Sequence, residues 1–394
     1  MDPYINPFTP GAGITPPELA GRQEVLEKAR TSFRRAVAGK NARHMLLLGL
    51  RGTGKTALLN AIERIGCEEE LLVTRFEASE DKTFVEMLTV DIRKVLRSLS
   101  TIGVARDLAT QGLGVLKSFA STVTKLSAFG ASIEVNPVLG EADSGYLEKD
   151  LPDIFAAVGR AAAAAGKGWV LLIDEVQYLA AADLSALIGA LHRMNQIQTP
   201  VVCVSAGLPQ VAKLAGDAKS YAERLFACTE IGALDRVDAR QAILRPIEDE
   251  GASIDAAALD AIVDGAHGYP FYLQAWGSEV WDQAAGPSID LNDALNARHR
   301  TREMLDNGFF RVRTDRLTPA EMTFVTAMAD LGDGPYPIAE VAAKLGKSLG
   351  SLGPTRAGAI NKGMIYSSGH GVLDFTVPLF ADHLRRCVAS TREN

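Results

Sequence analysis

The sequence lacks the signals of several protein classes. Its four cysteines are far apart and form no C-x-x-C pair, so neither a zinc site nor a disulfide framework is expected and a reducing cytoplasm fits. No apolar run approaches the length that spans a bilayer. The first residues, MDPYINPFTPGAG, lack the basic start and apolar stretch of a signal peptide. These absences favour a cytoplasmic protein that does not engage a membrane.

The chain also lacks an excess of positive charge. Its formal net charge is −7 at pH 7, so the whole protein is not a polyanion binder and any nucleic-acid site must be a local patch. Its composition is that of a globular protein, with 47% hydrophobic and 23% charged residues. The 394 residues suffice for two or three domains with a sizeable core.

One motif is a full match to the phosphate-binding P-loop, because residues 49–56 read GLRGTGKT. Its glycines would let backbone N–H groups turn toward phosphate oxygens. Lys55 would place a positive charge at the β- and γ-phosphates, and the Thr56 hydroxyl would ligate Mg²⁺. The following helix would direct its positive N-terminal end at the same anion. The residues expected to contact the nucleotide here are Gly49, Gly52, Thr53, Gly54, Lys55, Thr56 and Ala57.

The neighbouring sequence gives this motif the context that it requires. Residues 45–48 form an apolar run that predicts a buried strand. Residues 57–65 predict a helix with Leu58, Leu59 and Ile62 on one face. The order strand, loop and helix therefore favours a nucleotide site over a glycine-rich turn with a stray lysine.

Acidic and polar residues follow two further predicted strands. Asp174 and Glu175 end the apolar run WVLLI, where Asp174 would hold the Mg²⁺ shell and Glu175 would polarise the attacking water. The other interpretation is a pair of ordinary loop acids. Ser205 ends the strand predicted at 201–205, where it would hold the water near the γ-phosphate, or it is an ordinary serine at a strand end.

Arg224 lies in SYAERLF, after what we expect to be the last strand of the sheet. From there an arginine would reach a γ-phosphate, in its own chain or in a neighbouring one, and neutralise developing charge. A surface salt bridge is the alternative.

The chain divides into four predicted segments. These are an extended segment over 1–17, rich in proline and glycine, a P-loop core over 18–234, a helical lid over 235–307 and a C-terminal domain over 308–394. Within the core, helices are predicted at 23–38, 81–99 and 184–194 and a further strand at 71–76. Residues 101–146 are an insertion rich in Gly, Ala, Ser and Thr, which is either a helix packed on the core or a mobile, partner-binding element.

The C-terminal domain resembles a winged helix. Helices are predicted at 319–331, 338–345 and 355–362, followed by a hairpin of 364–367 with 372–377 across Gly369-His370-Gly371. In a DNA-binding version the third helix would enter the groove. The side chains that would then meet phosphates are Lys344, Lys347, Arg356, Lys362 and His370. A role in docking protein is the alternative.

Six segments in this order resemble AAA+ ATPases of the initiator type and the STAND signalling ATPases: LAGRQE, GLRGTGKT, LLIDE, SAGLP, SYAERLF and GYPFYLQ. The resemblance implies an α/β fold, with a P-loop NTPase parallel sheet, a helical lid and a C-terminal winged helix. It also implies that Gly21 and Arg22 touch the adenine and that Gly268 and Pro270 pack against the nucleotide. The chain departs from many AAA+ proteins in having no arginine at 271–279 that could serve as a second sensor.

The main hypothesis is therefore a slow ATPase that binds ATP or ADP with Mg²⁺ and acts as a molecular switch. Two rivals remain open. One is an ATP-regulated protein that binds double-stranded DNA, of the initiator or transposition-helper type. The other is a signalling or defence ATPase whose winged helix docks protein, with nucleotide-dependent homo-oligomers.

Overall fold

The computed structural model describes residues 1–11, 13–79, 83–123 and 126–393. The chain divides into two compact units. The α/β unit comprises Arg22–Gly49 and Lys55–Ile231, and the helical unit comprises Met1–Gly21, Leu50–Gly54 and Gly232–Asn394. The middle of the P-loop motif thus groups with the helical unit, whereas both of its ends belong to the α/β unit.

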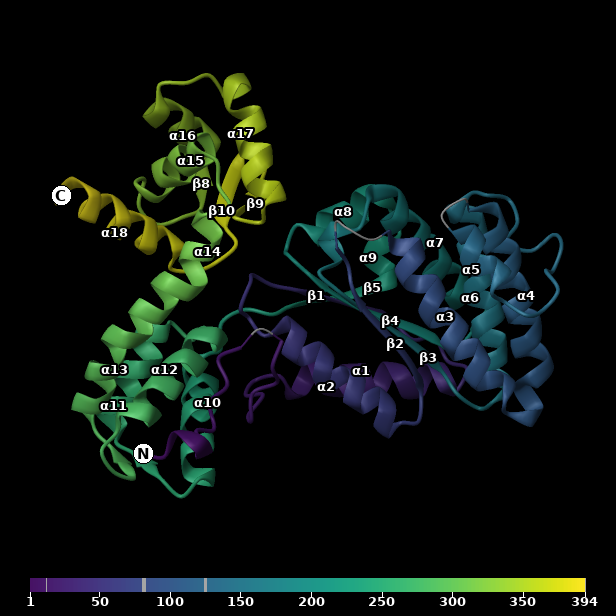
Figure 1. Cartoon of the computed structure of the whole chain (residues 1–394), viewed down its shortest axis with the longest axis horizontal. Helices are drawn as coiled ribbons and strands as arrows, with labels where there is room; N and C mark the ends of the chain where they lie inside the picture. Colours follow the sequence, from purple (N-terminus) through teal and green to yellow (C-terminus); the bar gives the residue numbers. More distant parts are fainter. Residues whose placement is uncertain (12, 80–82, 124–125, 394) are drawn as a thin grey trace. The chain divides into compact units, whose positions relative to one another are not determined.

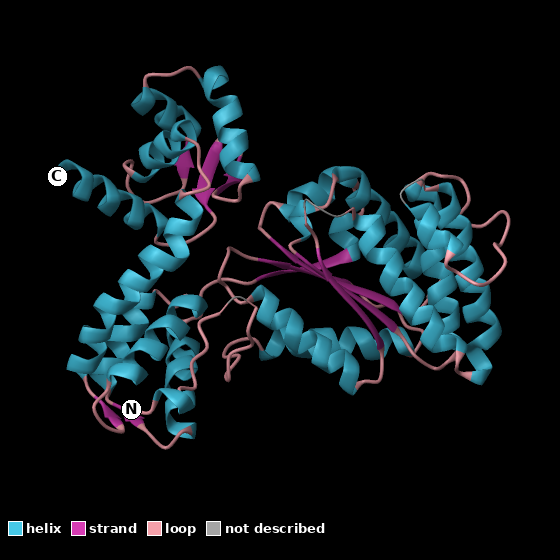
Figure 2. Ribbon diagram, in the orientation of Figure 1, coloured by secondary structure: helices cyan, strands magenta, loops and turns pink. Residues whose placement is uncertain are grey.

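A five-stranded parallel sheet lies at the centre of the α/β unit, in the order β2-β3-β4-β1-β5 (Figures 1 and 2). Its strands are β1 (His44–Leu48), β2 (Leu72–Glu77), β3 (Trp169–Asp174), β4 (Val201–Gly207) and β5 (Phe226–Glu230). The first four confirm predicted strands. We missed β5 because FACTE alternates buried with exposed positions and forms no apolar run. The expectation that Arg224 follows the last strand is therefore wrong, since β5 comes after it and pairs with β1.

Alternate residues of the strands face two layers of helices. Met45 and Leu47 belong to one apolar cluster with α1 and α2, whereas Leu46 and Leu48 belong to a second cluster with α3, α4, α6 and α7. This alternation follows from the period of two along a strand. The helices of the unit are α1 (Gln23–Val37), α2 (Lys55–Glu68), α3 (Phe84–Ser100), η2 (Gly103–Ala105), α4 (Arg106–Thr122), α5 (Ser127–Ala131), α6 (Leu147–Ala164), η4 (Val176–Tyr178), α7 (Ala181–Gln196), α8 (Val211–Ala218) and α9 (Ala222–Leu225). The start predicted for α3, at 81, lies outside the described residues.

The segment 101–146 contains a helix that packs within the α/β unit. Helix α4 buries Leu113, Leu116 and Phe119 in the same cluster as α3 and α6. These contacts support the first of the two interpretations, a helix packed on the core. Helix α6 follows this segment and was not predicted, although it has a buried apolar face formed by Leu151, Ile154, Phe155 and Val158.

The helical unit contains α10–α18 and a single apolar cluster that joins α10–α13 to α15–α18. Its N-terminal residues pack on α12, where Phe8 lies against Gly277. The elements are η1 (Pro3–Ile5), α10 (Arg236–Asp249), β6 (Ser253–Ile254), α11 (Ala256–Ala266), α12 (Pro270–Gln283), β7 (Ser288–Ile289), α13 (Leu291–Met304), the π-helical η5 (Leu305–Phe310) and α14 (Arg311–Thr314), then α15 (Pro319–Ala329), β8 (Tyr336–Pro337), α16 (Ile338–Leu345), α17 (Leu349–Asn361), β9 (Ile365–Gly369), β10 (Val372–Phe375) and α18 (Phe380–Glu393).

The last part of the chain has three helices and a hairpin in the predicted order. Strands β9 and β10 are antiparallel, and β8 completes a sheet in the order β8-β10-β9. Helix α17 begins at Leu349, earlier than the predicted 355, because Ser348 caps its N-terminus by accepting a hydrogen bond from the N–H of Ser351. Within the part of the chain that the structure describes, no helix has an apolar stretch long enough to cross a membrane.

Candidate functional site

The P-loop motif connects β1 to α2, as the sequence predicted. Gly52 and Gly54 have φ values of 82° and 88°, which a side chain would strain. Thr53 is buried, and its hydroxyl donates to the carbonyl of Leu50 at 2.9 Å. At the start of α2, the buried Lys55 ammonium donates to the carbonyl of Gly49 at 2.9 Å, in the α/β unit. These contacts turn the chain sharply between a strand and a helix N-terminus, which is the geometry that favours anion binding.

Thr56 and Asp174 are brought together in the α/β unit. The Thr56 hydroxyl donates to Oδ2 of Asp174 at 2.7 Å, although the two residues are 118 positions apart. Asp174 ends β3 and is 4% exposed, and burial raises the pKa of its carboxyl above the usual value. Among the described residues, no Lys, Arg or His forms an ion pair with it. A hydroxyl and a buried carboxylate are hard oxygen donors, so this pair fits Mg²⁺.

Glu175 follows in a left-handed conformation, with φ 50°. Its N–H donates to Oδ1 of Asp174 at 2.9 Å. Its carboxylate accepts a hydrogen bond from Nε2 of Gln177, and Oε1 of Gln177 accepts the N–H of Leu208 at 3.2 Å. Gln177 thus connects the carboxylate of Glu175, the predicted water-polarising group, to the backbone of Leu208 just after β4 through two hydrogen bonds. We did not single out Gln177 in the sequence, where its only signal is an amide two residues after the acidic pair.

Ser205 lies on the other face of the sheet. It is in register with Ile173, so its side chain is on the face opposite Asp174 and Thr56. Its hydroxyl contacts Sγ of Cys203 at 3.3 Å, and both residues are buried. The structure therefore does not bring the Ser205 hydroxyl to the pair of Thr56 and Asp174.

The remaining predicted residues of the α/β unit lie in or next to helices. Arg224 is an exposed residue of the short helix α9, just before β5. Arg22 is half-buried at the start of α1, and Ala57 is buried in the first turn of α2.

Gly21 and Gly268 are tightly packed positions of the helical unit, the first against a side chain and the second against backbone. Both have positive φ, at 68° and 66°. A Cβ on Gly21 would lie 2.3 Å from the Asp238 carboxylate, and one on Gly268 would lie 2.3 Å from the carbonyl of Leu234. Pro270 then occupies the first turn of α12. Only glycine fits at these two positions, which gives a packing reason for their presence.

The middle of the P-loop motif contacts two parts of the helical unit. The hydroxyl of Tyr269 donates to the carbonyl of Arg51, and the N–H of Phe271 donates to the carbonyl of Gly52 at 3.3 Å. The N–H of Arg51 donates to the carbonyl of Thr376, after β10, at 2.9 Å. The variable positions of the motif gave no signal for these contacts in the sequence.

The candidate DNA-binding residues fall into two groups. Lys362 forms an ion pair with the buried Glu321 at 2.6 Å, and Lys344 forms one with Asp330 at 3.7 Å. Lys347, Arg356 and His370 are exposed on α16–α17 and the hairpin. Of these residues, Lys347 and Arg356 carry charge that no ion pair among the described residues uses.

Comparison with known proteins gives a domain and a fold. Residues 18–204 match a family described as "AAA ATPase domain", and residues 307–384 match a domain of unknown function (DUF8462). No curated protein matches the chain.

Three solved structures are similar over most of the chain. The Walker-type ATPase PABY2304 of Pyrococcus abyssi is 16% identical with a TM-score of 0.54, over 93% of this chain and 96% of that one. The RuvB Holliday junction branch migration motor of Thermotoga maritima is 17% identical with a TM-score of 0.47, over 95% and 98%. The Orc1 protein of Aeropyrum pernix, solved in complex with DNA, is 12% identical with a TM-score of 0.46, over 100% and 98%. The chain has the fold of a P-loop NTPase, and its residues 18–204 carry the match to the AAA ATPase domain.

Proposed function

We propose that the protein is an ATP-dependent molecular switch that binds Mg-ATP and hydrolyses it slowly. The nucleotide state repositions a C-terminal winged-helix domain, residues 308–394. The other proposed domains are the core, residues 18–234, and the lid, residues 235–307. The observation that carries the proposal is the set of contacts by which Arg51 and Gly52, in the middle of the P-loop motif, meet Tyr269, Phe271 and Thr376.

The α/β unit supplies the groups for phosphate chemistry. Lys55 would hold the phosphates, and Thr56 and Asp174 would hold Mg²⁺. The metal, when bound, neutralises charge that develops on the phosphates. Glu175, positioned by Gln177, accepts a hydrogen bond from the attacking water and orients it. Gly21, Arg22, Gly268 and Pro270 are proposed to contact the nucleotide on the basis of the sequence resemblance.

The contacts of Arg51 give a physical route from phosphate to domain position. A phosphate group draws the N–H groups of the loop toward itself, so the carbonyls and N–H groups of residues 50–54 must reorient when it binds or leaves. Thr376 is fixed to its own domain, because its hydroxyl donates to the carbonyl of Gly363 at 2.6 Å. Reorienting Arg51 therefore changes the free energy of holding residues 363–377 in place.

Nucleotide binding and hydrolysis by the wild type, Lys55→Ala and Glu175→Gln test the site. We expect Lys55→Ala to weaken ATP binding, and Glu175→Gln to keep binding but to lose turnover by about 100-fold. Unchanged hydrolysis in both variants would reject the assignment.

The coupling is tested separately, by hydrogen exchange in residues 363–377 with ADP and with a non-hydrolysable ATP analogue. We expect exchange in this segment to differ between the two nucleotides in the wild type and to differ less in Tyr269→Phe, which lacks the donor to Arg51. The matched control is Tyr336→Phe, whose hydroxyl donates within its own domain to Gly332. Equal exchange with both nucleotides in the wild type would rule out the coupling while leaving ATP binding intact.

A second candidate function, regulated binding to double-stranded DNA, is supported by the exposed Lys347, Arg356 and His370. We expect binding to a duplex that weakens as salt rises, changes with nucleotide and drops in Lys347→Glu/Arg356→Glu. Lys362→Glu is an unsuitable test because it would also leave Glu321 without its counter-ion. If no duplex binds at low salt, the winged helix is proposed to dock protein. Light scattering then tests for nucleotide-dependent assembly.

A further inference from the structure

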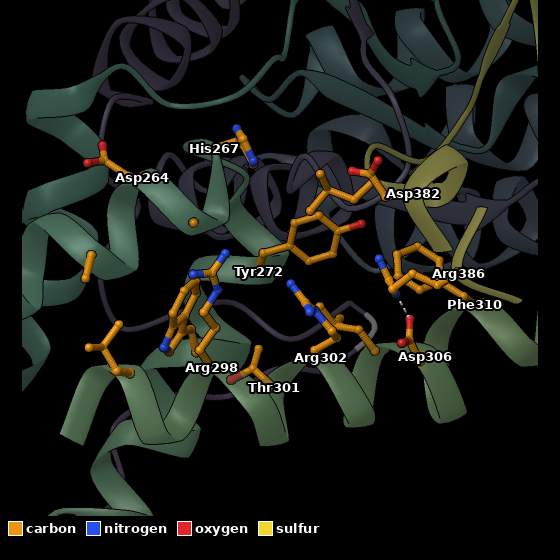
Figure 3. Close-up of a pocket in the computed structure, with 16 residues that line it drawn as sticks. Asp264, His267, Tyr272, Arg298, Thr301, Arg302, Asp306, Phe310, Asp382 and Arg386 are labelled. Carbon is orange, nitrogen blue, oxygen red and sulfur yellow. Dashed lines mark hydrogen bonds and ion pairs between the residues drawn. The ribbon is translucent and has the colours of Figure 1, made fainter. Parts of the chain in front are cut away.

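A pocket of about 480 Å³ opens at the surface of the helical unit (Figure 3). It is lined by α11, α12, α13, η5, α18 and Leu379, and by no residue of the P-loop motif. Its volume is in the range of small-molecule sites. The π-helical turn η5 forms part of the wall, and such turns occur often at functional sites.

Aromatic rings form the apolar part of the lining. Tyr272, Trp276 and Phe310 are buried, together with apolar side chains of η5 and α11. The polar atoms of the first two are already satisfied by the protein. Nε1 of Trp276 donates to the carbonyl of Ala294 at 3.0 Å, and the Tyr272 hydroxyl donates to the carbonyl of Pro378 at 2.5 Å. Both rings therefore offer carbon surface to a ligand, which favours an apolar body.

The acidic residues of the lining are already paired with cations. Asp264 pairs with Arg236, and Asp382 pairs with Arg385. Oδ1 of Asp306 is 2.8 Å from Nδ1 of His383, and it accepts from the Arg386 guanidinium at 2.6 Å. The carboxylates of the cavity are thus neutralised within the protein.

The basic residues of the lining are not neutralised in the same way. Arg298 and Arg302 are four residues apart on α13, and both point toward the side of the cavity where Tyr272 lies (Figure 3). Within the described residues, neither guanidinium has an ion pair or a hydrogen-bond acceptor. The Nε atom of Arg386 is buried and has no hydrogen-bond partner. Arg298 and Arg302 are exposed to solvent, so an anion would gain charge-assisted hydrogen bonds from them. The guanidinium of Arg386 is already paired with Asp306, and only its buried Nε–H, which lacks an acceptor, would gain a further contact.

We propose that this cavity binds a small amphiphilic anion. Its ring or acyl body would lie on Tyr272, Trp276 and Phe310, and its carboxylate, phosphate or sulfonate group would meet Arg298 and Arg302. The bound molecule would contact both α13 and α18, so it would stabilise the packing of the last helix on the lid helices. Binding does not depend on the proposed ATPase activity.

The test uses the fluorescent probe 8-anilinonaphthalene-1-sulfonate, which joins an aromatic body to one anionic group, with the full-length chain. We expect saturable binding to one site. In Arg298→Ala/Arg302→Ala, binding should be about tenfold weaker or more, because two charge-assisted contacts are lost. The matched control is Arg300→Ala, which removes an exposed arginine of the same helix that does not line the cavity. It should change the affinity by less than about twofold, as expected for a distant surface charge.

Two further measurements separate this site from the alternatives. N-phenyl-1-naphthylamine, a neutral probe with the same rings, should bind the wild type and the double variant equally, since the arginines act on the anion alone. Lys55→Ala should leave the affinity for the sulfonate unchanged, which excludes the P-loop as the binding place. Equal binding of the sulfonate to the wild type and the double variant would overturn the proposal. So would an equal loss in Arg300→Ala, or an equal loss of the neutral probe in the double variant.

Discussion

The two units differ in which charge they leave without a counter-ion. In the α/β unit, the buried Asp174 has a hydroxyl and a backbone N–H as its hydrogen-bond partners. Among the described residues no cation lies within ion-pair distance of it, although the charge of Lys55 acts on it from further away. In the helical unit the situation is reversed: Asp306 is matched by His383 and Arg386, whereas Arg298 and Arg302 are unmatched within the described part of the chain. Burying a charge without a partner is costly. That cost applies to the buried Asp174, in keeping with the proposed metal cation. Arg298 and Arg302 are exposed and solvated, and their unpaired guanidinium groups are the ones that the proposed organic anion would meet.

The comparison is tested most strongly by Asp174→Asn. We expect ATP hydrolysis to fall by about 100-fold or more, because an amide is a poor Mg²⁺ ligand. The nucleotide-free protein should become more stable at pH 7. Burial raises the pKa of Asp174, so the folded state binds its proton more tightly than the unfolded chain and stability falls as pH rises through this range. Asparagine carries no charge, so the variant does not bear the free-energy cost of burying an ionised carboxylate.

An ATPase assay measures the loss of hydrolysis. Thermal unfolding with and without Mg-ATP measures the change in stability. The wild type should gain stability from Mg-ATP, and the variant should gain much less. Asp183→Asn is the control, since burial also raises the pKa of Asp183 but the residue lies on α7, in no motif of the site. An apo variant that is less stable than the wild type would show that Asp174 is compensated after all.

Two buried histidines, His44 and His383, differ in the groups that surround them. Among the described residues, no carboxylate acts on His44. It accepts the N–H of Cys203 at 3.1 Å, and burial lowers its pKa from 6.5 to about 4. The unfolded chain therefore binds a proton that the fold excludes, and stability is full above pH 6.5 and is lost as pH falls toward 4. The loss from this residue reaches about 3 kcal/mol. His383 in the helical unit is instead 2.8 Å from Asp306.

The three tryptophans allow the two units to be followed separately. Trp169 lies in the α/β unit, and Trp276 and Trp281 lie in the helical unit. In Trp276→Phe/Trp281→Phe, acid titration in mild denaturant should report loss of the α/β unit below pH 6.5, and adding His44→Gln should flatten that pH dependence. If the slope survives His44→Gln, another group of the α/β unit carries the acid sensitivity.

The sequence was informative where a side-chain type has a chemical reason to be at one position. GLRGTGKT and the pair Asp174 and Glu175 fall in such patterns, and the apolar runs located four of the five strands. The sequence did not predict the role of a residue where that role depends on contacts that only the fold creates. Nothing in the sequence places Thr376 beside Arg51, or distinguishes Arg298 from the paired arginines. Ser205 shows the same limit, since a strand end does not reveal which face a side chain occupies.

The third prediction concerns a carboxylate whose charge is compensated. Glu321 is buried; burial alone would raise its pKa, but hydrogen bonds from Lys362 and Thr318 outweigh it and lower the pKa. Lys362→Met should lower the free energy of unfolding by about 2 kcal/mol, because it leaves the buried Glu321 carboxylate without a counter-ion. Lys344→Met removes the half-exposed ion pair with Asp330 and should lower the free energy of unfolding by less than about 0.5 kcal/mol. Denaturant unfolding measures both, and Glu321→Gln/Lys362→Met should recover much of the loss. Equal costs for the two lysines would contradict the role of burial.

The smallest expected effect concerns Glu175, the other carboxylate of the α/β site, whose carboxylate accepts a hydrogen bond from the Gln177 amide. An amide orients a carboxylate without neutralising it. Gln177→Leu should therefore lower kcat for ATP by about tenfold and leave KM unchanged, because the loss falls on water orientation and not on nucleotide binding. Gln177→Glu would repel Glu175 and lower kcat further, whereas Gln177→Asn should recover part of the rate. A rise in KM with unchanged kcat would mean that Gln177 shapes the nucleotide site itself. In that case the short chain of contacts from Glu175 through Gln177 to Leu208 would not position the catalytic carboxylate.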